Sequence, residues 1–352
     1  MTTINDVAKY ANLSIATVSR ALNKPELVNA DTRERVMHAA RKLNYFTAEK
    51  TQVANLKSRK LTFGVIIPYI TEFYFGELYT GISRMAQTQD IHLLLYELNI
   101  ENMSKDGLTQ AYNFAKQHWV DGILLASFYM PADYDEWIEQ TDIPVVLLLA
   151  SHENAKLPAF KVDDIRASFD VVAYLVSRGH RSIGMIAPPS GNLNGGESSR
   201  FNGYKQAIDF YRLPFTEQHV AYGNIRYEEG YAAMRRLLSD LDRTGITAVF
   251  AATDEMAIGA MRCIHDAGLR VPQDISVIGY DNLTIANMSM PKLTTVEQPF
   301  GEIGAEAFKY LVKLASDPTQ MPRRGNNYFP HKIIERESVV TLPPSSAADL
   351  PS

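Results

Sequence analysis

A short run near the N-terminus combines side chains that suit the reading of a DNA duplex. Arg20 can donate two hydrogen bonds to the major-groove edge of a guanine. Ile15 and Ala16 are small or apolar enough to lie against thymine methyl groups, and Thr17 and Ser19 can hydrogen-bond to phosphates or bases. On one exposed helix face, these five residues would form a base-reading surface.

Three short helices are predicted around that run, and they place it on the second helix. Thr3 and Asp6 have the spacing of a capping box, and Ser14 and Asn29 suit the N-caps of two later helices, the last of which runs to about Asn44. Apolar residues at helical spacing predict a shared core: Ile4, Val7, Ala8 and Ala11 in the first helix, Val18, Ala21 and Leu22 in the second, and Val36, Ala39, Ala40 and Leu43 in the third. The pattern is typical of a helix-turn-helix with a supporting helix, and a plain three-helix bundle with an incidental polar face is the alternative.

The charge of the chain is divided unevenly along its length. Residues 1–60 contain eleven Lys and Arg against five Asp and Glu, a balance of +6, whereas the rest contains 24 basic and 35 acidic residues, a balance of -11. A basic N-terminal segment followed by an acidic remainder favours contact with phosphate through the N-terminal segment only. On charge alone, a solvated basic face explains the same numbers.

The first two predicted helices match a known pattern. Residues 3–8 read Thr-Ile-Asn-Asp-Val-Ala and residues 14–23 read Ser-Ile-Ala-Thr-Val-Ser-Arg-Ala-Leu-Asn, with further matches at 32–36 and 43–45. This segment closely resembles the headpiece of the lactose/galactose repressor family, and the resemblance extends to about Val340. It implies a sequence-specific DNA-binding transcriptional repressor.

The resemblance also implies particular DNA contacts. Ile15, Ala16 and Arg20 occupy the positions that choose operator bases. The positions that contact the DNA backbone are Thr3, Ser19, Asn23, Asn29 and Thr32. Apart from the resemblance, helix N-termini capped by Thr3, Ser14 and Asn29 present free backbone amides, which bind phosphate well.

A polar and basic segment with helical potential follows at residues 46–60. In the family that it resembles, this segment becomes a hinge helix on DNA and inserts a leucine from each subunit into the minor groove, so Leu56 is the expected wedge. The usual proline and asparagine are replaced by Thr47 and Ala48, and Leu56 lies a residue or two out of the common register. A flexible tether is the alternative for the free chain.

Beyond residue 60, short apolar runs alternate with amphipathic helical segments. The runs that predict buried parallel strands are 62–68, 92–96, 122–126, 145–149, 182–187, 248–252 and 275–279. The helical segments lie at 75–89, 165–177, 229–240 and 255–267. This alternation predicts an α/β core with doubly wound parallel sheets, and the resemblance implies two lobes of the periplasmic-binding-protein type.

Domain boundaries follow from these patterns. We expect a helix-turn-helix headpiece at 1–45, a hinge or linker at 46–60, an effector-binding and dimerisation core at 61–341, and a flexible tail at 342–352. The resemblance implies three crossings between the lobes, which we place near Val162, Pro291 and Met321. Lobe one is then expected at about 61–162 and 292–321, and lobe two at about 163–291 and 322–341.

The loops at the carboxyl ends of the predicted strands are where a parallel sheet binds its ligand. They contain the aromatic pair Tyr74 and Phe75, the cation Arg200, and the polar residues Thr253 and Asp281. A stacking wall with a cation and a carboxylate suits a small polyhydroxylated molecule, and the resemblance places Tyr74, Phe75, Arg200 and Asp281 at effector-contacting positions. We therefore expect a carbohydrate effector, either a sugar or a sugar phosphate.

Simpler roles stay open for several acidic residues near these loops. Asp254 follows a strand and can equally cap the next helix. Asp163 and Asp164 lie at a predicted lobe crossing, where a loop cap is the simpler role and contact with the ligand is the alternative.

Other classes of protein are disfavoured by what the sequence lacks. It contains no nucleotide-binding glycine fingerprint, no His-Glu-x-x-His pair and no nucleophile elbow, so we expect neither an enzyme nor a cofactor. The single cysteine, Cys263, excludes an internal disulfide and a cysteine-built metal site. Without a membrane span or a signal peptide, the expected location is the cytoplasm.

Two related functions compete with a sugar-responsive repressor. A transport-type sugar receptor would share the lobes but has no use for residues 1–60. The core also resembles catabolite control proteins, which a phosphorylated phosphocarrier protein activates, at residues 253–257 and 330–333. Two arginines expected for that interaction are Met290 and Lys309 here, which favours a small-molecule effector.

The number of subunits follows from the DNA target. A headpiece with one Arg20 discriminates too little between base pairs to select a site alone. Two headpieces that read a palindromic operator require a two-fold homodimer.

Overall fold

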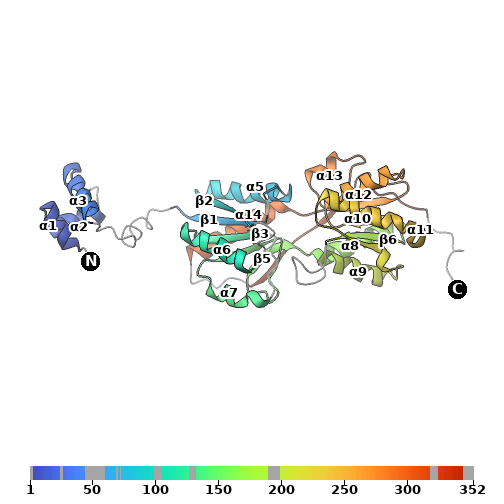
Figure 1. Cartoon of the computed structure of the whole chain (residues 1–352), viewed down its shortest axis with the longest axis horizontal. Helices are drawn as coiled ribbons and strands as arrows, with labels where there is room; N and C mark the ends of the chain where they lie inside the picture. The colour runs from blue at the N-terminus through green and yellow to red at the C-terminus, as the bar shows by residue number, and fades with distance from the viewer. Residues whose placement is uncertain are drawn as a thin grey trace. The chain divides into compact units, whose positions relative to one another are not determined.

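The computed structural model describes residues 3–23, 27–43, 60–68, 70–71, 73–98, 105–126, 132–188, 199–317 and 324–343. The chain forms two compact units, Met1–Leu61 and Thr62–Ser352. Each unit has its own hydrophobic core, so each is described by itself (Figure 1).

The first unit contains the three predicted helices: α1 (Ile4–Ala11), α2 (Ile15–Asn23) and α3 (Ala30–Lys42). Val7, Val18 and Val36, one from each helix, are fully buried against one another's helices. All the other apolar residues predicted to face inward are buried or partly buried in the same cluster. The helical periodicity of the sequence therefore located this core correctly.

The predicted helix caps are present. Thr3 and Asp6 form the capping box of α1. The Ser14 hydroxyl accepts a hydrogen bond from the Thr17 amide at 3.1 Å, and the Asn29 side chain accepts one from the Thr32 amide at 2.8 Å. These caps satisfy amides that the first helical turns leave without a partner.

The second unit contains two six-stranded sheets, and we call each sheet with its helices a lobe. The first sheet has the order β11 (Gly325–Phe329), β5 (Pro158–Val162), β4 (Val145–Leu148), β3 (Gly122–Ala126), β1 (Thr62–Ile67), β2 (His92–Glu97). The second has the order β12 (Lys332–Ile334), β10 (Thr294–Glu297), β9 (Ser276–Asp281), β8 (Ala248–Ala251), β6 (Ile183–Ala187), β7 (Val220–Tyr222). All of these pairings are parallel except that of β12 with β10, so the predicted α/β fold class is confirmed.

Helices flank both sheets (Figure 1). The helices of the first lobe are α5 (Phe73–Thr88), α6 (Lys105–Gln117), the short helices η3 (Ala132–Tyr134) and α7 (Asp135–Gln140), and α14 (Phe300–Ser316). Those of the second are α8 (Asp164–Ser177), α9 (Ser199–Phe210), η4 (Glu217–His219), α10 (Tyr227–Ser239), α11 (Leu241–Thr244), α12 (Asp254–Asp266) and α13 (Thr284–Met288). Parallel strands need such crossover helices, which cover the apolar faces of the sheet.

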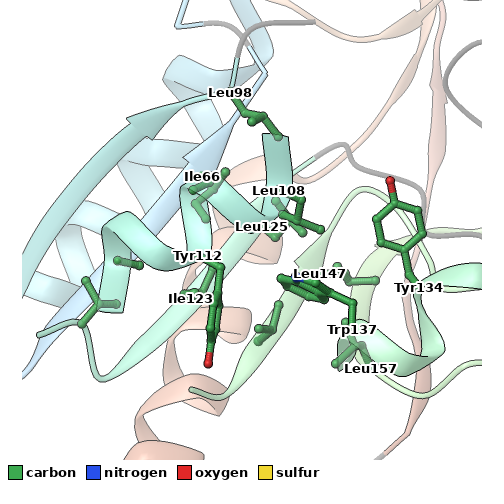
Figure 2. Close-up of a cluster of buried hydrophobic side chains, with 14 of the residues drawn as sticks. Ile66, Leu98, Leu108, Tyr112, Ile123, Leu125, Tyr134, Trp137, Leu147 and Leu157 are labelled. Atoms are coloured by element: carbon green, nitrogen blue, oxygen red, sulfur yellow. The ribbon is translucent and has the colours of Figure 1, made fainter. Parts of the chain in front are cut away.

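One core cluster of the first lobe lies between its sheet and the α6 and α7 helices, and α5 and α14 bury further apolar residues of the lobe. Figure 2 shows Trp137 and Tyr112 among aliphatic side chains of the strands, with ring centroids 5.5 Å apart and the rings edge to face. The Tyr112 hydroxyl donates to the Asp142 carboxylate at 2.5 Å, which gives the buried ring's polar end a partner.

Two of the predicted lobe crossings are wrong. Residues 294–297 form β10, which pairs with β9 in the second lobe, so the crossing lies after Glu297 rather than near Pro291. Residues 325–329 form β11, which pairs with β5 in the first lobe, so the last crossing lies between Phe329 and Lys332 rather than near Met321. Both strands contain many polar residues and therefore lack the continuous apolar signal of a buried parallel strand.

Cys263 is buried, as expected of a small apolar side chain. No helix within the described ranges is both long and apolar enough to cross a membrane. Among the same residues, no group of three His, Cys, Asp or Glu side chains is arranged to hold a metal ion.

Candidate functional site

The α2 helix presents the side chains proposed to read DNA. Ile15, Ala16 and Arg20 are exposed, and Thr17 and Ser19 are half-buried. Val18 and Ala21 are buried on the opposite side of the helix and fix its orientation in the headpiece. The local sequence thus sorts α2 into a packed face and an exposed face that carries the predicted base-reading residues.

The other predicted DNA contacts lie at helix N-termini. The Thr3 and Ser14 hydroxyls are exposed and cap α1 and α2 respectively, and Asn29 is exposed and caps α3 with Thr32 beside it. Two predicted contacts, the side chain of Asn23 and all of Leu56, lie outside the described residues.

The second candidate site is a group of charged side chains at the carboxyl ends of the second-lobe strands, where that lobe meets the crossings from the first. We call it the junction cluster and define it as Lys161, Asp164, Arg200, Tyr280, Asp281 and Gln298. The cluster joins Arg200 and Asp281, which the sequence predicted as effector-binding residues, to four residues that were not among the predicted set.

Asp164 is held at the centre of the cluster by three donors. Lys161 Nζ lies 2.9 Å from one carboxylate oxygen, and Arg200 Nε and the Tyr280 hydroxyl each donate to the other at 3.1 Å. Burial alone would raise the pKa of Asp164, but the charges of Lys161 and Arg200 outweigh burial and hold its pKa below the ordinary value. Asp164 is therefore ionised, and its carboxylate is fully occupied.

Arg200 is the organising cation. Its guanidinium lies over the Tyr280 ring, 3.8 Å from the centroid, and also donates to the backbone carbonyl of Ala252. One terminal nitrogen reaches Asp281 at 3.5 Å, which is at the long limit of a hydrogen bond. Arg200 thus combines a firm anchor on Asp164 with a looser contact to Asp281.

Asp281 ends β9 in a strained and desolvated position. Its backbone φ is +116°, which a residue with a Cβ rarely adopts, and its side chain is 6% exposed. Burial raises the pKa of Asp281 to about 6, although Arg200 and a 2.7 Å hydrogen bond from the Gln298 amide oppose the rise. Backbone strain of this kind concentrates at ligand sites.

A buried carboxylate behind the cluster supports the strained turn. Asp254 accepts hydrogen bonds from the Leu283 amide at 2.7 Å and the Thr295 hydroxyl at 2.5 Å. Burial, with the nearby charge of Asp281, raises the pKa of Asp254 well above its ordinary value. Gly279 leaves room for this side chain, because a Cβ there would lie 2.3 Å from Asp254 Oδ1.

The suggestion that Asp254 caps the next helix is wrong. Thr253 is the N-cap of α12: its hydroxyl accepts from the Met256 amide at 3.2 Å and donates to the Ile225 carbonyl at 3.3 Å. The hydrogen-bonding capacity of Thr253 is thus largely used within the lobe. Asp163 caps α8 through the Arg166 amide, which leaves Asp164 free to join the cluster.

The predicted aromatic pair lies at the start of α5 in the first lobe. Phe75 is 3% exposed and packs within that lobe, and Tyr74 is half-buried between Phe75 and Phe300, with ring centroids 4.3 and 5.8 Å away. The neighbouring Phe73 is exposed. Phe75 therefore serves the first-lobe core, and Tyr74 keeps only part of its ring for a ligand.

Sequence reasoning missed Lys161, Tyr280 and Gln298. Lys161 lies on β5, a strand that was not predicted, and Gln298 directly follows β10, which was assigned to the wrong lobe. Because Tyr280 directly precedes Asp281, the sequence could have placed it at the end of the same strand. The sequence could not have indicated that its hydroxyl contacts Asp164, which lies 116 positions away.

Comparisons with known proteins match both the headpiece and the core. Residues 3–48 match the family model described as bacterial regulatory proteins of the lacI family, and residues 172–339 match the model of a periplasmic binding protein-like domain. Catabolite control protein A of Priestia megaterium is 33% identical over 331 residues, which cover 92% of this chain and 97% of that protein.

Two solved structures cover nearly the whole chain. The lac repressor dimer bound to operator and the anti-inducer ONPF has a TM-score of 0.70 and 26% identity, and the match covers 96% of this chain and 99% of that one. A complex of the transcriptional regulator CelR with cellobiose has a TM-score of 0.69 and 26% identity, with 96% and 100% covered.

A helix-turn-helix headpiece followed by a two-lobed periplasmic-binding-protein-like core defines a ligand-responsive DNA-binding regulator. The chain belongs to the lacI family of bacterial transcriptional regulators. Because members of this family regulate transcription, the protein is a DNA-binding regulator with an effector-binding core and not an enzyme.

Proposed function

We propose that the protein is a homodimeric transcriptional repressor that acts in the cytoplasm and whose affinity for a palindromic operator is set by a carbohydrate-type effector bound between its lobes. The observation that carries the proposal is the junction cluster, in which Arg200 at the start of α9 contacts Asp281 at the end of β9, beside the lobe crossings. The same chain carries a DNA-reading headpiece, so a bound effector has a DNA-binding activity to control.

In the headpiece, Arg20, Ile15 and Ala16 read operator bases in the major groove, since they are the exposed residues of α2. The phosphate contacts come from Thr3, Ser14, Asn29 and Thr32 at helix N-termini and from Thr17, Ser19 and Asn23 of α2. Leu56 is the proposed minor-groove wedge. A dimer supplies two reading helices, as in the operator-bound lac repressor dimer to which this chain is similar.

In the core, Arg200 and Asp281 hold the effector, and Tyr74 packs against it. Thr253 belongs to the proposed pocket, although its hydroxyl already has partners in the lobe. The similar regulator CelR was solved with cellobiose, which is consistent with a carbohydrate here.

Effector binding is linked to the lobe crossings through Gln298. The Gln298 amide donates to Asp281, and the Gln298 carbonyl accepts from the Phe300 amide at the start of α14 in the first lobe. An effector that engages Asp281 therefore acts directly on a crossing strand. It shifts operator affinity to the extent that it binds one arrangement of the lobes better than the other. By analogy with the family, we expect an inducer; a corepressor would use the same linkage with the opposite sign.

The test is a thermal-shift screen of mono- and disaccharides on the purified chain, followed by operator-binding titrations with each hit. A ligand selective for the folded state raises the melting temperature. The proposal requires a compound that both stabilises the protein and changes operator affinity. A stabilising compound that leaves operator affinity unchanged would contradict it.

A second candidate is a catabolite-control regulator that responds to a phosphorylated phosphocarrier protein. The 33% identity to catabolite control protein A favours it. Against it, Met290 is 96% exposed where an arginine is expected, and Lys309 is paired with Glu306 at 2.7 Å. Neither side chain offers the bidentate donor that suits a phosphate. Addition of the phosphorylated carrier protein should leave operator affinity unchanged.

A transport-type sugar receptor is a weaker rival. It would use the same lobes, but it has no role for a headpiece that matches a DNA-binding family over residues 3–48. Selection of a preferred duplex from random DNA by the full chain would exclude it.

A further inference from the structure

We propose that the effector is an uncharged polyhydroxylated molecule and that the junction cluster discriminates against its phosphorylated counterparts. This inference rests on the proposed function and narrows it, because a sugar and a sugar phosphate both suit the general fold. It follows from where the cations of the cluster lie and from what they already bind.

The two cations of the junction cluster are already neutralised. Lys161 is 2.9 Å from Asp164, and Arg200 contacts Asp164 at 3.1 Å and Asp281 at 3.5 Å. Lys161, Asp164, Arg200 and Asp281 carry two positive and two negative charges when all are ionised. An incoming phosphate would need to displace a carboxylate from Arg200, and that carboxylate would stay buried without a cation, which is costly.

Cations farther along the second sheet are also engaged. The Arg336 guanidinium donates to the Asn282 side chain at 2.6 Å and to the Leu293 carbonyl at 2.7 Å. Lys332 stands directly opposite Glu297 in the antiparallel ladder, where opposite charges attract. The hydrogen-bond donors of Arg336 are thus used within the lobe, and Lys332 has a carboxylate opposite it.

The pKa of Asp281 reflects how strongly the site is desolvated. A carboxylate beside an arginine ordinarily has a lowered pKa. The pKa of Asp281 is instead raised to about 6, because burial and the charges of Asp164 and Glu77 outweigh Arg200 and Gln298. The pKa of Glu77 is raised too, by burial and by Glu297. The desolvation that disfavours the charged form of Asp281 also disfavours the burial of an added dianion.

Three of the sequence segments that follow strands contain no cation. In the sequence, residues 99–104, 127–131 and 189–198, which come after β2, β3 and β6, contain no lysine or arginine, and they contain the acidic residues Glu101 and Glu197. Phosphate-binding loops ordinarily supply such a cation or a helix N-terminus. The cation beyond β7, Arg226, is exposed and is the N-cap residue of α10, which follows an edge strand.

Hydroxyl groups, in contrast, match what the cluster offers. A sugar hydroxyl both donates and accepts. Asp281 accepts, and the terminal nitrogen of Arg200 that reaches Asp281 at only 3.5 Å donates. A pair of adjacent hydroxyls can therefore bridge Arg200 and Asp281 without changing the net charge of the site.

The test is a thermal-shift and calorimetric screen of the full chain at pH 7.5 with matched pairs: ribose and ribose 5-phosphate, glucose and glucose 6-phosphate, cytidine and its 5′-monophosphate. Asp281→Asn, which conserves size, identifies shifts that arise at the junction cluster, since the basic headpiece also attracts anions. Its melting temperature without ligand reports whether it is folded. We expect a neutral compound to bind at least about tenfold more tightly than its phosphate, a difference of about 1.4 kcal/mol.

The outcomes separate this inference from the proposed function. A phosphorylated compound that binds more tightly than its neutral partner, with the binding lost in Asp281→Asn, would overturn the inference and leave an effector-controlled regulator intact. If no member of any pair gives a shift that Asp281→Asn removes, both the inference and the assigned effector site are abandoned.

Charge variants decide whether discrimination is electrostatic. Glu77→Gln removes an exposed negative charge that makes a small contribution to the raised pKa of Asp281, and it should narrow the preference for the neutral partner by about twofold. The matched control is Glu217→Gln. Glu217 is exposed and precedes β7, so it lies near the amino ends of the strands, and its substitution should leave the preference for the neutral partner unchanged. An unchanged preference in Glu77→Gln would mean that shape excludes the phosphate, which would overturn the charge argument.

Discussion

The headpiece and the junction cluster use arginine in opposite ways. Arg20 is exposed on α2, in a segment with an excess of positive charge, whereas Arg200 is mostly buried and held by Asp164, Asp281 and the Tyr280 ring. An exposed cation attracts phosphate over a distance and is screened by salt. A buried cation that is paired with carboxylates exerts little long-range attraction on anions. It can still orient the hydroxyl groups of a ligand that has bound beside it. One chain thus separates attraction to a polyanion from recognition of a small molecule.

Salt should produce the largest difference between the two regions. If each dimer neutralises about six to ten phosphates, operator affinity should fall by about 10³- to 10⁵-fold between 50 and 200 mM salt. Effector affinity at the buried cluster should change little over the same range. Titrations with operator DNA and with the effector at several salt concentrations measure how each affinity depends on salt. A flat operator slope would contradict the role given to the basic headpiece.

Removal of Asp281 should abolish the response to the effector and leave operator affinity unchanged. Asp281→Ala leaves Arg200 without its second carboxylate and removes the proposed acceptor, and the loss of one partner of a buried charge pair costs about 2–5 kcal/mol in binding. Calorimetry with a screened ligand, together with operator titration, tests both halves. Normal effector binding by a folded Asp281→Ala protein would show that the site is elsewhere.

Core stability should depend on pH through Asp281. Its pKa in the folded protein, about 6, lies above its ordinary value, so protonated Asp281 stabilises the fold at low pH and this contribution is lost as pH rises through 6. A shift of about two units corresponds to about 2–3 kcal/mol. Denaturant titrations of wild type and Asp281→Asn between pH 4.5 and 7.5 should show a larger loss of stability in wild type than in the variant. Parallel profiles would contradict the assigned burial effect.

The smallest predicted effect is the loss of operator affinity on substitution of Arg20. Arg20→Ala should cost about 1–3 kcal/mol per half-site and relax the choice of bases, because Arg20 is placed to contact a guanine edge. Binding to operator and to random DNA should be compared at one salt concentration. An equal loss on both DNAs would mean that Arg20 contacts phosphate only.

The two regions also differ in how far they could be predicted. In the headpiece, the caps at Thr3, Ser14 and Asn29 and the buried valines of all three helices followed from the sequence. These features depend on residues three or four positions apart. In the core, the strands with continuous apolar runs were found, whereas β10 and β11 were assigned to the wrong lobes.

The amino-acid sequence by itself determined the helix-turn-helix, the α/β core and the positions of Arg200 and Asp281, because periodicity, capping and strand-end loops are local patterns. Only the tertiary structure decided which charges neutralise which. Asp164 meets Arg200 across 36 positions and Tyr280 across 116, and Gln298 meets Asp281 because β10 lies beside β9. Ion pairs of this kind depend on strand order and burial, and no local pattern of residues specifies either.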